Sequence, residues 1–280
     1  MEISLKNAIN IGISAAETKA ASALFQNKKL PDEYKSCDNY FMCDGLWAAE
    51  KLIEKKIRVP MFFVCPEKIK TEEDKNCVEK LAKYAEKTYI ISEKVCAKIS
   101  DRDGAEGAFI VAEMKKLTLS DIELKENMTS IILDGQEQPG NIGAIIRSLD
   151  GAGGDFAVYT HKRCKMTHSR LIRASLGAAF MMPFVEADFD ELIAWLTENN
   201  FKVISTDLSA TKNYYEVDFS GRIAIVCGNE YLGVSKEWKT LPITEPVIIP
   251  MLGSVESLNV GFASTLVAYE CSLRQKGLIK

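Results

Sequence analysis

Apolar residues along this chain fall into short runs separated by amphipathic stretches, a pattern typical of alternating strands and helices. In the first part, apolar runs predict strands at 59–65 and 108–112, and helical spacing predicts helices at 45–55, 75–86 and 92–99. In the second part, longer apolar runs predict strands at 130–133, 155–159, 202–206, 222–227 and 246–249. Helical stretches separate these strands, so the sequence predicts an α/β fold with a largely parallel sheet covered on both faces.

A polar stretch of mixed charge, residues 115–127, interrupts the pattern and has no strong period of its own. Such a composition is typical of a linker between two folded parts. We therefore predict a small N-terminal α/β domain at residues 1–118, a linker at 119–127 and a second α/β domain at 128–280.

One predicted helix carries an arginine with no evident structural task. Its apolar residues share one face at helical spacing: Ile142, Ile145, Ile146 and Leu149. Arg147 lies roughly opposite that face and is the only Lys or Arg between Lys125 and Lys162. We predict that Asn141 begins this helix and Gly151 ends it. The helix follows a strand, so Asn141 and Arg147 are expected near a strand's carboxyl end, where open α/β sheets bind ligands. A solvated surface arginine is the alternative.

Two further strand ends carry polar residues. The apolar run 225–227 stops abruptly at Gly228-Asn229-Glu230, where a glycine permits close approach of a ligand to the backbone. The run Val247–Met251 is followed by Ser257-Leu258-Asn259, which opens a long helix through about Cys271. Singly, each has a structural explanation: an ordinary turn, Ser257 as an N-cap and Asn259 as a first-turn polar residue. Three such ends in one domain favour a ligand site.

Composition changes this picture little. The net charge of −4 over 280 residues argues against a uniformly basic nucleic-acid surface, yet a local basic segment can still bind phosphates. The segment 161–173 is such a candidate, because it has no acidic residue and contains Lys162, Arg163, Lys165 and Arg170. Its alternatives are a solvated loop or, for Arg173, a structural or dimerisation role.

Cysteine and apolar patterns favour a cytoplasmic protein without metal. The eight cysteines include no C-x-x-C pair and only two histidines are available to join them, so a zinc site is not expected. The irregular cysteine spacing and the absence of a secretory apolar region predict reduced thiols. No apolar run approaches the roughly 20 residues of a membrane helix.

Taken together, these motifs resemble the SpoU (TrmH-like) branch of the SPOUT RNA methyltransferases. The resemblance covers the second half and depends on N-x-G-x-x-x-R at 141–147, Gly-Asn-Glu at 228–230, Ile-Pro-Met at 249–251 and Ser-Leu-Asn-Val at 257–260. The first half is similar to the RNA-binding substrate domain of many members, with Ile99-Ser100-Asp101 leading to Gly107. Two positions depart from the family, which often has glycine at Tyr231 and serine at Gly261.

The resemblance implies a deep trefoil knot, a rare exception to unknotted topology. It implies that S-adenosylmethionine is the cofactor, held by Gly228, Ile249 and Leu258, and that a ribose 2′-hydroxyl of RNA is methylated. It also implies a homodimer in which Arg147 of one chain serves cofactor bound to the other. The implied catalytic residues are Arg147, Asn141, Glu230, Ser257 and Asn259. Arg147 is either a base assisted by a substrate phosphate or an electrostatic stabiliser of developing negative charge.

Rival interpretations come from other classes. Gly151-Ala152-Gly153-Gly154 follows a helix and precedes a strand, the reverse of a dinucleotide-binding fingerprint. An RNA-binding protein of the same fold without catalysis is the stronger alternative, although every expected catalytic residue is present. The appended N-terminal domain favours ribosomal RNA over tRNA as the substrate. The modified nucleotide, and a housekeeping or antibiotic-resistance role, are left open.

Overall fold

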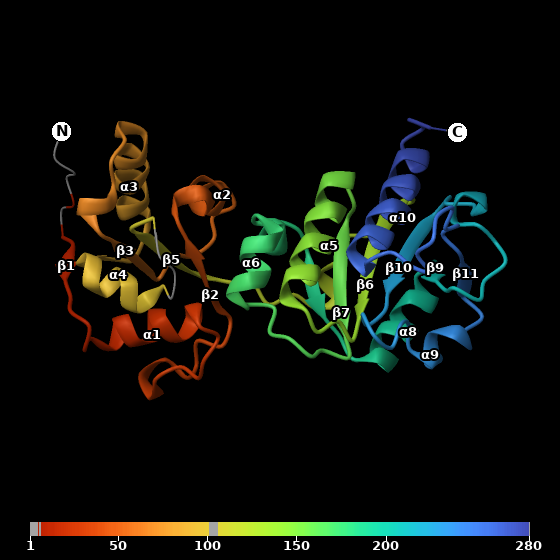
Figure 1. Cartoon of the computed structure of the whole chain (residues 1–280), viewed down its shortest axis with the longest axis horizontal. Helices are drawn as coiled ribbons and strands as arrows, with labels where there is room; N and C mark the ends of the chain where they lie inside the picture. The colour runs from red at the N-terminus through yellow and green to blue at the C-terminus, as the bar shows by residue number, and fades with distance from the viewer. Residues whose placement is uncertain (1–4, 6, 101–105, 280) are drawn as a thin grey trace. The chain divides into compact units, whose positions relative to one another are not determined.

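The computed structural model describes residues 5, 7–100 and 106–279, which form two compact units. The first comprises Met1–Lys115 with Met166–Arg173, and the second comprises Lys116–Lys165 with Ala174–Lys280 (Figure 1). Asp101 of the segment before Gly107 lies outside the described residues. The boundaries predicted for the two domains stay predictions; Leu119 and Ile122, inside the predicted linker, are buried in the core of the second unit.

The first unit is built on a mixed five-stranded sheet. Its strands, in spatial order, are β1 (Ile9–Asn10), β4 (Lys87–Ile90), β3 (Met61–Val64), β5 (Ala108–Glu113) and β2 (Tyr40–Asp44). Its helices are α1 (Ala16–Phe25), α2 (Ala49–Glu54), α3 (Glu72–Tyr84) and α4 (Glu93–Ile99). The helix predicted at 45–55 is split into a 3-10 turn, Leu46–Ala48, and α2. Helix α3 begins earlier than predicted because the Thr71 side chain accepts a hydrogen bond from the Asp74 amide and caps it.

The second unit contains a six-stranded sheet in which every neighbouring pair is parallel. The strands, in spatial order, are β11 (Thr244–Val247), β9 (Phe201–Thr206), β10 (Arg222–Cys227), β6 (Met128–Asp134), β7 (Phe156–Thr160) and β8 (Phe184–Glu186). The helices of this part are α5 (Pro139–Ala152), α6 (Ser169–Ser175), α7 (Ala178–Met181), α8 (Phe189–Glu198), α9 (Lys236–Lys239) and α10 (Val260–Gln275), with the first residues of α6 belonging to the first unit. The predicted parallel α/β fold is confirmed.

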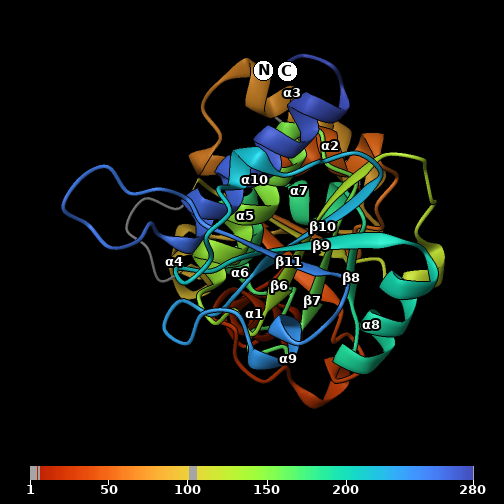
Figure 2. The ribbon, with the colours of Figure 1, turned by 90° about the vertical axis from the view of Figure 1, so that its right-hand side faces the viewer.

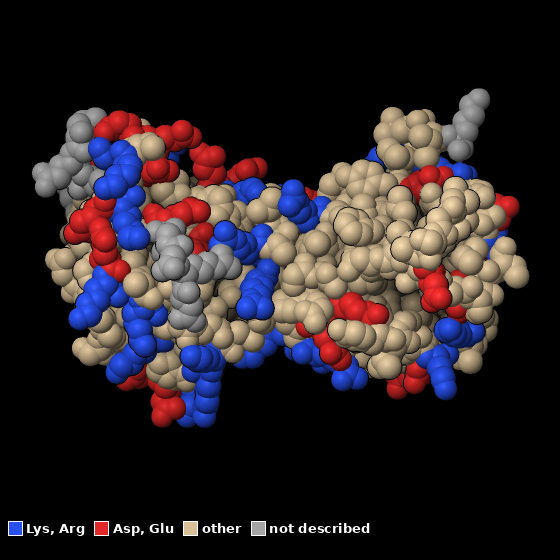
Figure 3. Space-filling model, viewed as in Figure 1, with Lys and Arg blue, Asp and Glu red and all other residues tan. Residues whose placement is uncertain are grey.

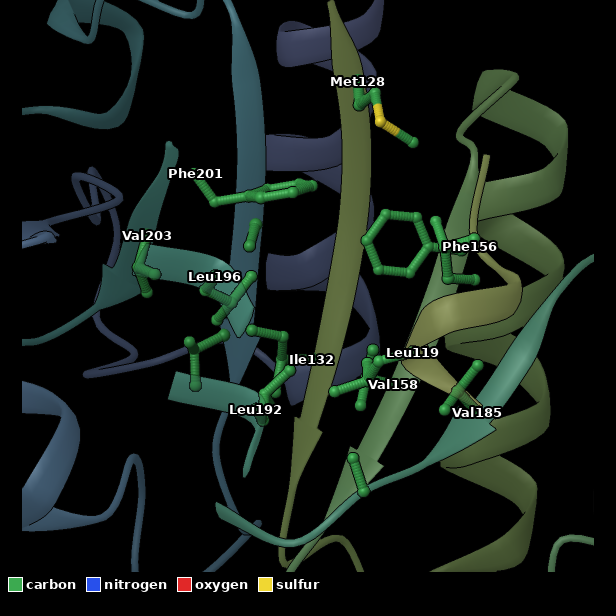
Figure 4. Close-up of a cluster of buried hydrophobic side chains, with 14 of the residues drawn as sticks. Leu119, Met128, Ile132, Phe156, Val158, Val185, Leu192, Leu196, Phe201 and Val203 are labelled. Atoms are coloured by element: carbon green, nitrogen blue, oxygen red, sulfur yellow. The ribbon is translucent and has the colours of Figure 1, made fainter. Parts of the chain in front are cut away.

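Helices cover both faces of this sheet, as the apolar strands require. On one face, Ile132 of β6 packs with Leu192 and Leu196 of α8 in a buried cluster (Figure 4). On the other face, α5 and α10 pack against each other and against β6. There, Thr129 of β6 lies 3.2 Å from the Cys271 sulfur of α10. Residues of β6 therefore point to opposite faces of the sheet and pack against the two helical layers.

The chain returns from the sheet edge to its centre after β11. Ile248 pairs in parallel with Asn213 of the segment that follows β9. The next residues form a loop, blue in Figure 2, that leads into α10, which packs on β6 and β10 in the middle of the sheet. A return of this kind, past β9 and β10, is compatible with the expected trefoil knot, which stays a prediction.

Candidate active site

A cavity of about 310 Å³ lies at the carboxyl ends of β9 and β10, against the segment that follows β11. The residues expected from the sequence that line it are Gly228, Glu230, Ile249, Ser257 and Leu258. Other lining residues include Thr206, Asp207, Leu208, Ile248 and Met251. Because the strands are parallel, their carboxyl ends meet at one edge of the sheet, and the cavity occupies the position where such folds bind ligands. Its size suits a small molecule.

Helix α5 holds Asn141, which does not line the cavity but contacts the lining residue Glu230. Pro139 occupies its first turn, where a missing N–H costs nothing, and Gly153 ends it in the left-handed conformation at φ 72°. The predicted start at Asn141 and end at Gly151 were therefore wrong. Because Gln138 is the N-cap residue, the Asn141 side chain does not cap, and its Nδ2 instead donates a 2.9 Å hydrogen bond to Glu230 Oε1.

Glu230 stands on a tight turn that Asn229 organises. The Asn229 Oδ1 accepts hydrogen bonds from the Tyr231 and Leu232 amides at 2.9 and 3.1 Å, and its backbone pairs with Gly233. This turn directs one Glu230 oxygen to Asn141. The other, Oε2, is buried without a hydrogen-bond partner among the described residues. A buried carboxylate oxygen without a donor is costly, so a donor on a bound ligand would relieve that cost.

Gly228 and Gln136 join β10 to the loop after β6. Gln136 is buried, and its Nε2 donates to the Gly228 carbonyl. The Asn229 Nδ2 donates to the Gly135 carbonyl at 2.8 Å. A Cβ on Gly228 would lie 2.2 Å from the Gly233 carbon and the Val234 nitrogen. Only glycine fits there, so backbone groups line this part of the cavity.

The structure does not bring every predicted residue into the cavity. Arg147 lies on the exposed face of α5 and makes no ion pair with any residue that the structure describes, whereas the apolar face of the same helix is buried. Asn259 is the N-cap of α10, and its Oδ1 accepts a 2.8 Å hydrogen bond from Gly261. The helix therefore begins at Val260, later than predicted, and Asn259 rather than Ser257 caps it.

Thr206, Asp207 and Leu208 line the cavity and were missed in the sequence. Thr206 is the last residue of β9, as predicted, and Asp207 and Leu208 directly follow it, so the strand-end rule that singled out Gly228 would have found them. Asp207 accepts from the Ser209 amide at 2.9 Å and pairs with Lys239 at 2.7 Å. Hydrogen bonds from Lys239 and the Ser209 backbone lower the pKa of Asp207 from 3.8 to about 2.

This lowered pKa predicts a stabilising contribution with a defined pH range. A carboxylate whose pKa is lower in the folded state stabilises it above the unfolded pKa, and that contribution is lost as the pH falls from about 4 toward 2. Replacing Asp207 by Asn is expected to lower the free energy of unfolding at pH 7 by about 2 kcal/mol, since the side chain is only 14% exposed. Urea unfolding followed by tryptophan fluorescence at pH 7 and pH 3 measures this.

The exposed Asp190 of α8 provides the matched control. Asp190→Asn is expected to change the free energy of unfolding by less than about 0.5 kcal/mol. Equal losses in the two variants, or a loss in Asp207→Asn that is as large at pH 3 as at pH 7, would show that the Lys239 pair does not act in this way.

The basic segment is divided between the two units. Lys162, Arg163 and Lys165 are exposed in the second unit, and Arg170 is exposed in the first. Lys162 pairs with Glu186, and Arg163 lies 3.6 Å from Glu137. Such exposed pairs contribute little to stability, so they leave both cations available to an anionic partner.

Within the described residues, no three His, Cys, Asp or Glu side chains are grouped to hold a metal ion. The described helices include none that is long and apolar enough to cross a membrane.

Comparison with known proteins relates this fold and site to RNA-modifying enzymes. Residues 128–269 match the model of the SpoU rRNA methylase family. Over 172 residues the chain is 31% identical to a 23S rRNA (uridine(2479)-2′-O)-methyltransferase of Streptomyces viridochromogenes, with 59% of each chain covered. It is also 31% identical to the 23S rRNA (guanosine-2′-O-)-methyltransferase RlmB of Ralstonia nicotianae, covering 65% of this chain and 74% of that protein.

Solved structures share the fold over nearly the whole chain. An AdoMet-bound rRNA methyltransferase from Sinorhizobium meliloti superposes with a TM-score of 0.84 at 22% identity, covering 98% of this chain and 100% of that one. An RNA 2′-O ribose methyltransferase superposes with a TM-score of 0.77 at 26% identity, covering 97% and 100%. The likeness therefore includes the first unit as well as the part matched by the family model.

Proposed function

The chain belongs to the SpoU rRNA methylase family, and we propose that it transfers a methyl group from S-adenosylmethionine to a ribose 2′-hydroxyl of ribosomal RNA. The observation that supports this proposal most directly is the hydrogen bond between Asn141 and Glu230. It joins Asn141 to Glu230, which lines the same cavity as Gly228, so two expected catalytic side chains lie at the expected cofactor-binding residues.

The cavity suits the proposed cofactor. When bound, S-adenosylmethionine supplies an activated methyl group. Gly228 offers backbone groups at close approach, and Ile249 and Leu258 offer apolar surface for an adenine ring. Glu230 contributes a buried carboxylate oxygen that has no donor among the described residues and is available to a ligand hydroxyl or amino group.

Each catalytic side chain has a task that its chemistry permits. The Arg147 guanidinium stabilises negative charge on the ribose oxygen or on the adjacent phosphate. Asn141 and Glu230 orient the ribose, and Ser257 lies at the same cavity. Asn259 holds the start of α10 and thereby the loop that carries Ser257 and Leu258.

Exposed basic and aromatic side chains provide the RNA contacts. Lys162, Arg163, Lys165 and Arg170 bind phosphates without reading sequence. Tyr231, which replaces the glycine common in the family, is 83% exposed at the cavity edge and so is available to stack on a base. We propose that the protein acts in the cytoplasm, on RNA that the first unit helps to select.

A homodimer completes the proposed site. Helix α10 exposes an apolar stripe formed by Phe262, Leu266 and Tyr269, at 69%, 42% and 40% exposure. The surface over α5 and α10 is largely free of charged side chains (Figure 3). An exposed apolar patch of this kind is typical of an interaction surface. A second copy bound here would bring the exposed Arg147 of α5 close to the partner's cavity.

Replacing Phe262 by Asp is expected to raise the dimer dissociation constant at least about 100-fold, because each subunit would bury an unpaired carboxylate. Sedimentation velocity at graded protein concentrations measures the change. Ile9→Asp introduces the same charge at an exposed residue of the first unit and is expected to leave the dimer intact. A monomeric wild type, or a dimeric Phe262→Asp variant, would contradict the proposed interface.

The substrate class is tested by methyl transfer from labelled S-adenosylmethionine to unmodified ribosomal RNA and tRNA transcripts. We expect label in ribosomal RNA alone. Label in tRNA alone would show a tRNA methyltransferase instead. RNA binding without any cofactor binding would establish the non-catalytic alternative.

A further inference from the structure

The first unit contains a cavity of about 540 Å³ that has no place in the proposed methyl transfer. It is lined by the residues after α1, the end of β2, the Trp47 ring and the segment His168–Arg173, all within this unit. The Ser169 hydroxyl donates a 2.7 Å hydrogen bond to the Phe25 carbonyl and so joins that segment to the end of α1. This hydrogen bond therefore fixes two of the segments that line the cavity to each other.

The charges of the wall favour an anion. Three exposed cations line the cavity: Lys28, Arg170 and Arg173. Among the described lining residues, Asp44 is the only carboxylate, and burial raises its pKa while Arg173 opposes that shift. Arg170 and Arg173 make no ion pair with any residue in the described part of the chain. Two guanidinium groups without an ion pair are well suited to phosphate.

The cavity also offers a flat aromatic surface. The Trp47 ring is held in place because its Nε1 donates a 3.0 Å hydrogen bond to the Asp44 carbonyl. The Lys51 ammonium lies 5.7 Å from the ring centre. An indole ring in a fixed orientation is a stacking surface for a nucleobase, and cations nearby would contact the phosphate of the same nucleotide.

We propose that this cavity binds one unpaired nucleotide of the substrate RNA, with its base on Trp47 and its phosphate on Arg170 and Arg173. The volume accommodates a nucleotide, since small-ligand pockets span roughly 300–1,000 Å³. Paired bases present no free face to the ring, so the cavity selects looped or bulged RNA over duplex. This inference rests on the proposed function for the identity of the ligand, and it deepens that function by naming how the first unit selects RNA.

Equilibrium binding to a hairpin RNA with an unpaired loop, and to a blunt duplex of equal length, tests the proposal. Trp47→Ala is expected to weaken hairpin binding about tenfold and to leave duplex binding unchanged, whereas Trp47→Phe retains most of the affinity. Arg173→Ala is expected to weaken binding and to reduce the salt dependence by about one counterion. Lys80→Ala, on the exposed face of α3 outside the cavity, is the matched control and is expected to bind as wild type.

Fluorescence gives a second readout that does not depend on stability. Trp47 is the only tryptophan of the first unit, so the difference in RNA-induced quenching between wild type and Trp47→Phe reports this ring alone. Quenching by the hairpin and not by inorganic phosphate supports the proposal. Wild-type hairpin affinity in Trp47→Ala together with no Trp47 quenching overturns it, and if wild type still methylates RNA in that case, the proposed function stands. A wild type that binds no RNA overturns both.

Discussion

Arg147→Ala is expected to lower the rate of methyl transfer roughly 100- to 1,000-fold while leaving the affinity for S-adenosylmethionine within about twofold of wild type. The guanidinium is exposed and does not line the cavity, so its removal changes neither the core nor the expected cofactor contacts. The positive charge of Arg147 is needed only during methyl transfer, when negative charge develops on the ribose oxygen or on the adjacent phosphate. Single-turnover transfer to RNA and calorimetric cofactor binding separate the two effects.

A control variant on the same helix is Ser148→Ala, at the next position of α5. It is expected to keep wild-type transfer, because no role is assigned to its side chain. An Arg147→Ala protein with normal transfer would remove Arg147 from the mechanism. Loss of cofactor binding in that variant would instead assign Arg147 to the cofactor site.

Gly228→Ala is expected to weaken cofactor binding at least about 100-fold. The added Cβ would meet backbone atoms of Gly233 and Val234 at 2.2 Å, and backbone cannot rotate away as a flexible side chain does. The turn that holds Asn229 and Glu230 must therefore shift. Calorimetric titration with S-adenosylmethionine measures the loss.

Gly253→Ala is the matched control, because a Cβ there meets nothing within 4 Å and the residue lies in the exposed loop before α10. It is expected to bind the cofactor as wild type does. Equal affinities for all three proteins would mean that Gly228 does not border the cofactor.

Mixing Arg147→Ala with Gly228→Ala subunits tests the shared site. If Arg147 serves the partner's cofactor, a mixed dimer has one site in which both groups are intact. Random exchange then restores about a quarter of wild-type activity, because half of the dimers are mixed and each has one working site of two. No recovery above the separate variants would show that Arg147 serves its own chain.

Local sequence patterns predicted the strands well because burial on both faces leaves long apolar runs. Strand β10 agrees residue for residue with the prediction, and β9 differs by one residue at its start. Both strands lie inside the sheet, and β10 is apolar at every position after Arg222. Strands β1, β2, β4 and β8 were missed; β1 and β8 have only two or three residues, which carry too little pattern.

Helix ends were predicted less well because the same side chains serve capping and long-range contacts. Asn141 has the composition of a helix start, yet it bonds Glu230, 89 residues away, and Pro139 begins the helix. Asn259 performs the capping that had been the structural alternative for Ser257. A polar residue near a helix start can cap the helix or bond a distant residue, and only the tertiary structure decides between these two roles.

The cavity in the first unit was beyond reach of sequence reasoning. Trp47 and Arg173 are far apart in the chain, and no single motif contains both. Arg170 was found, but as part of a continuous basic segment rather than as one wall of a cavity. Contacts between distant segments leave no periodic signal, in contrast to the strand ends that revealed the Gly228 and Glu230 site.

The most direct test of the proposed chemistry is the position of the transferred methyl group. RNA labelled by the protein is hydrolysed in alkali, which cleaves next to a free 2′-hydroxyl but not next to a methylated one. The proposed function predicts that the label appears in an alkali-resistant dinucleotide and disappears with Arg147→Ala. Label in a mononucleotide would place the methyl group on a base and contradict ribose 2′-O-methylation.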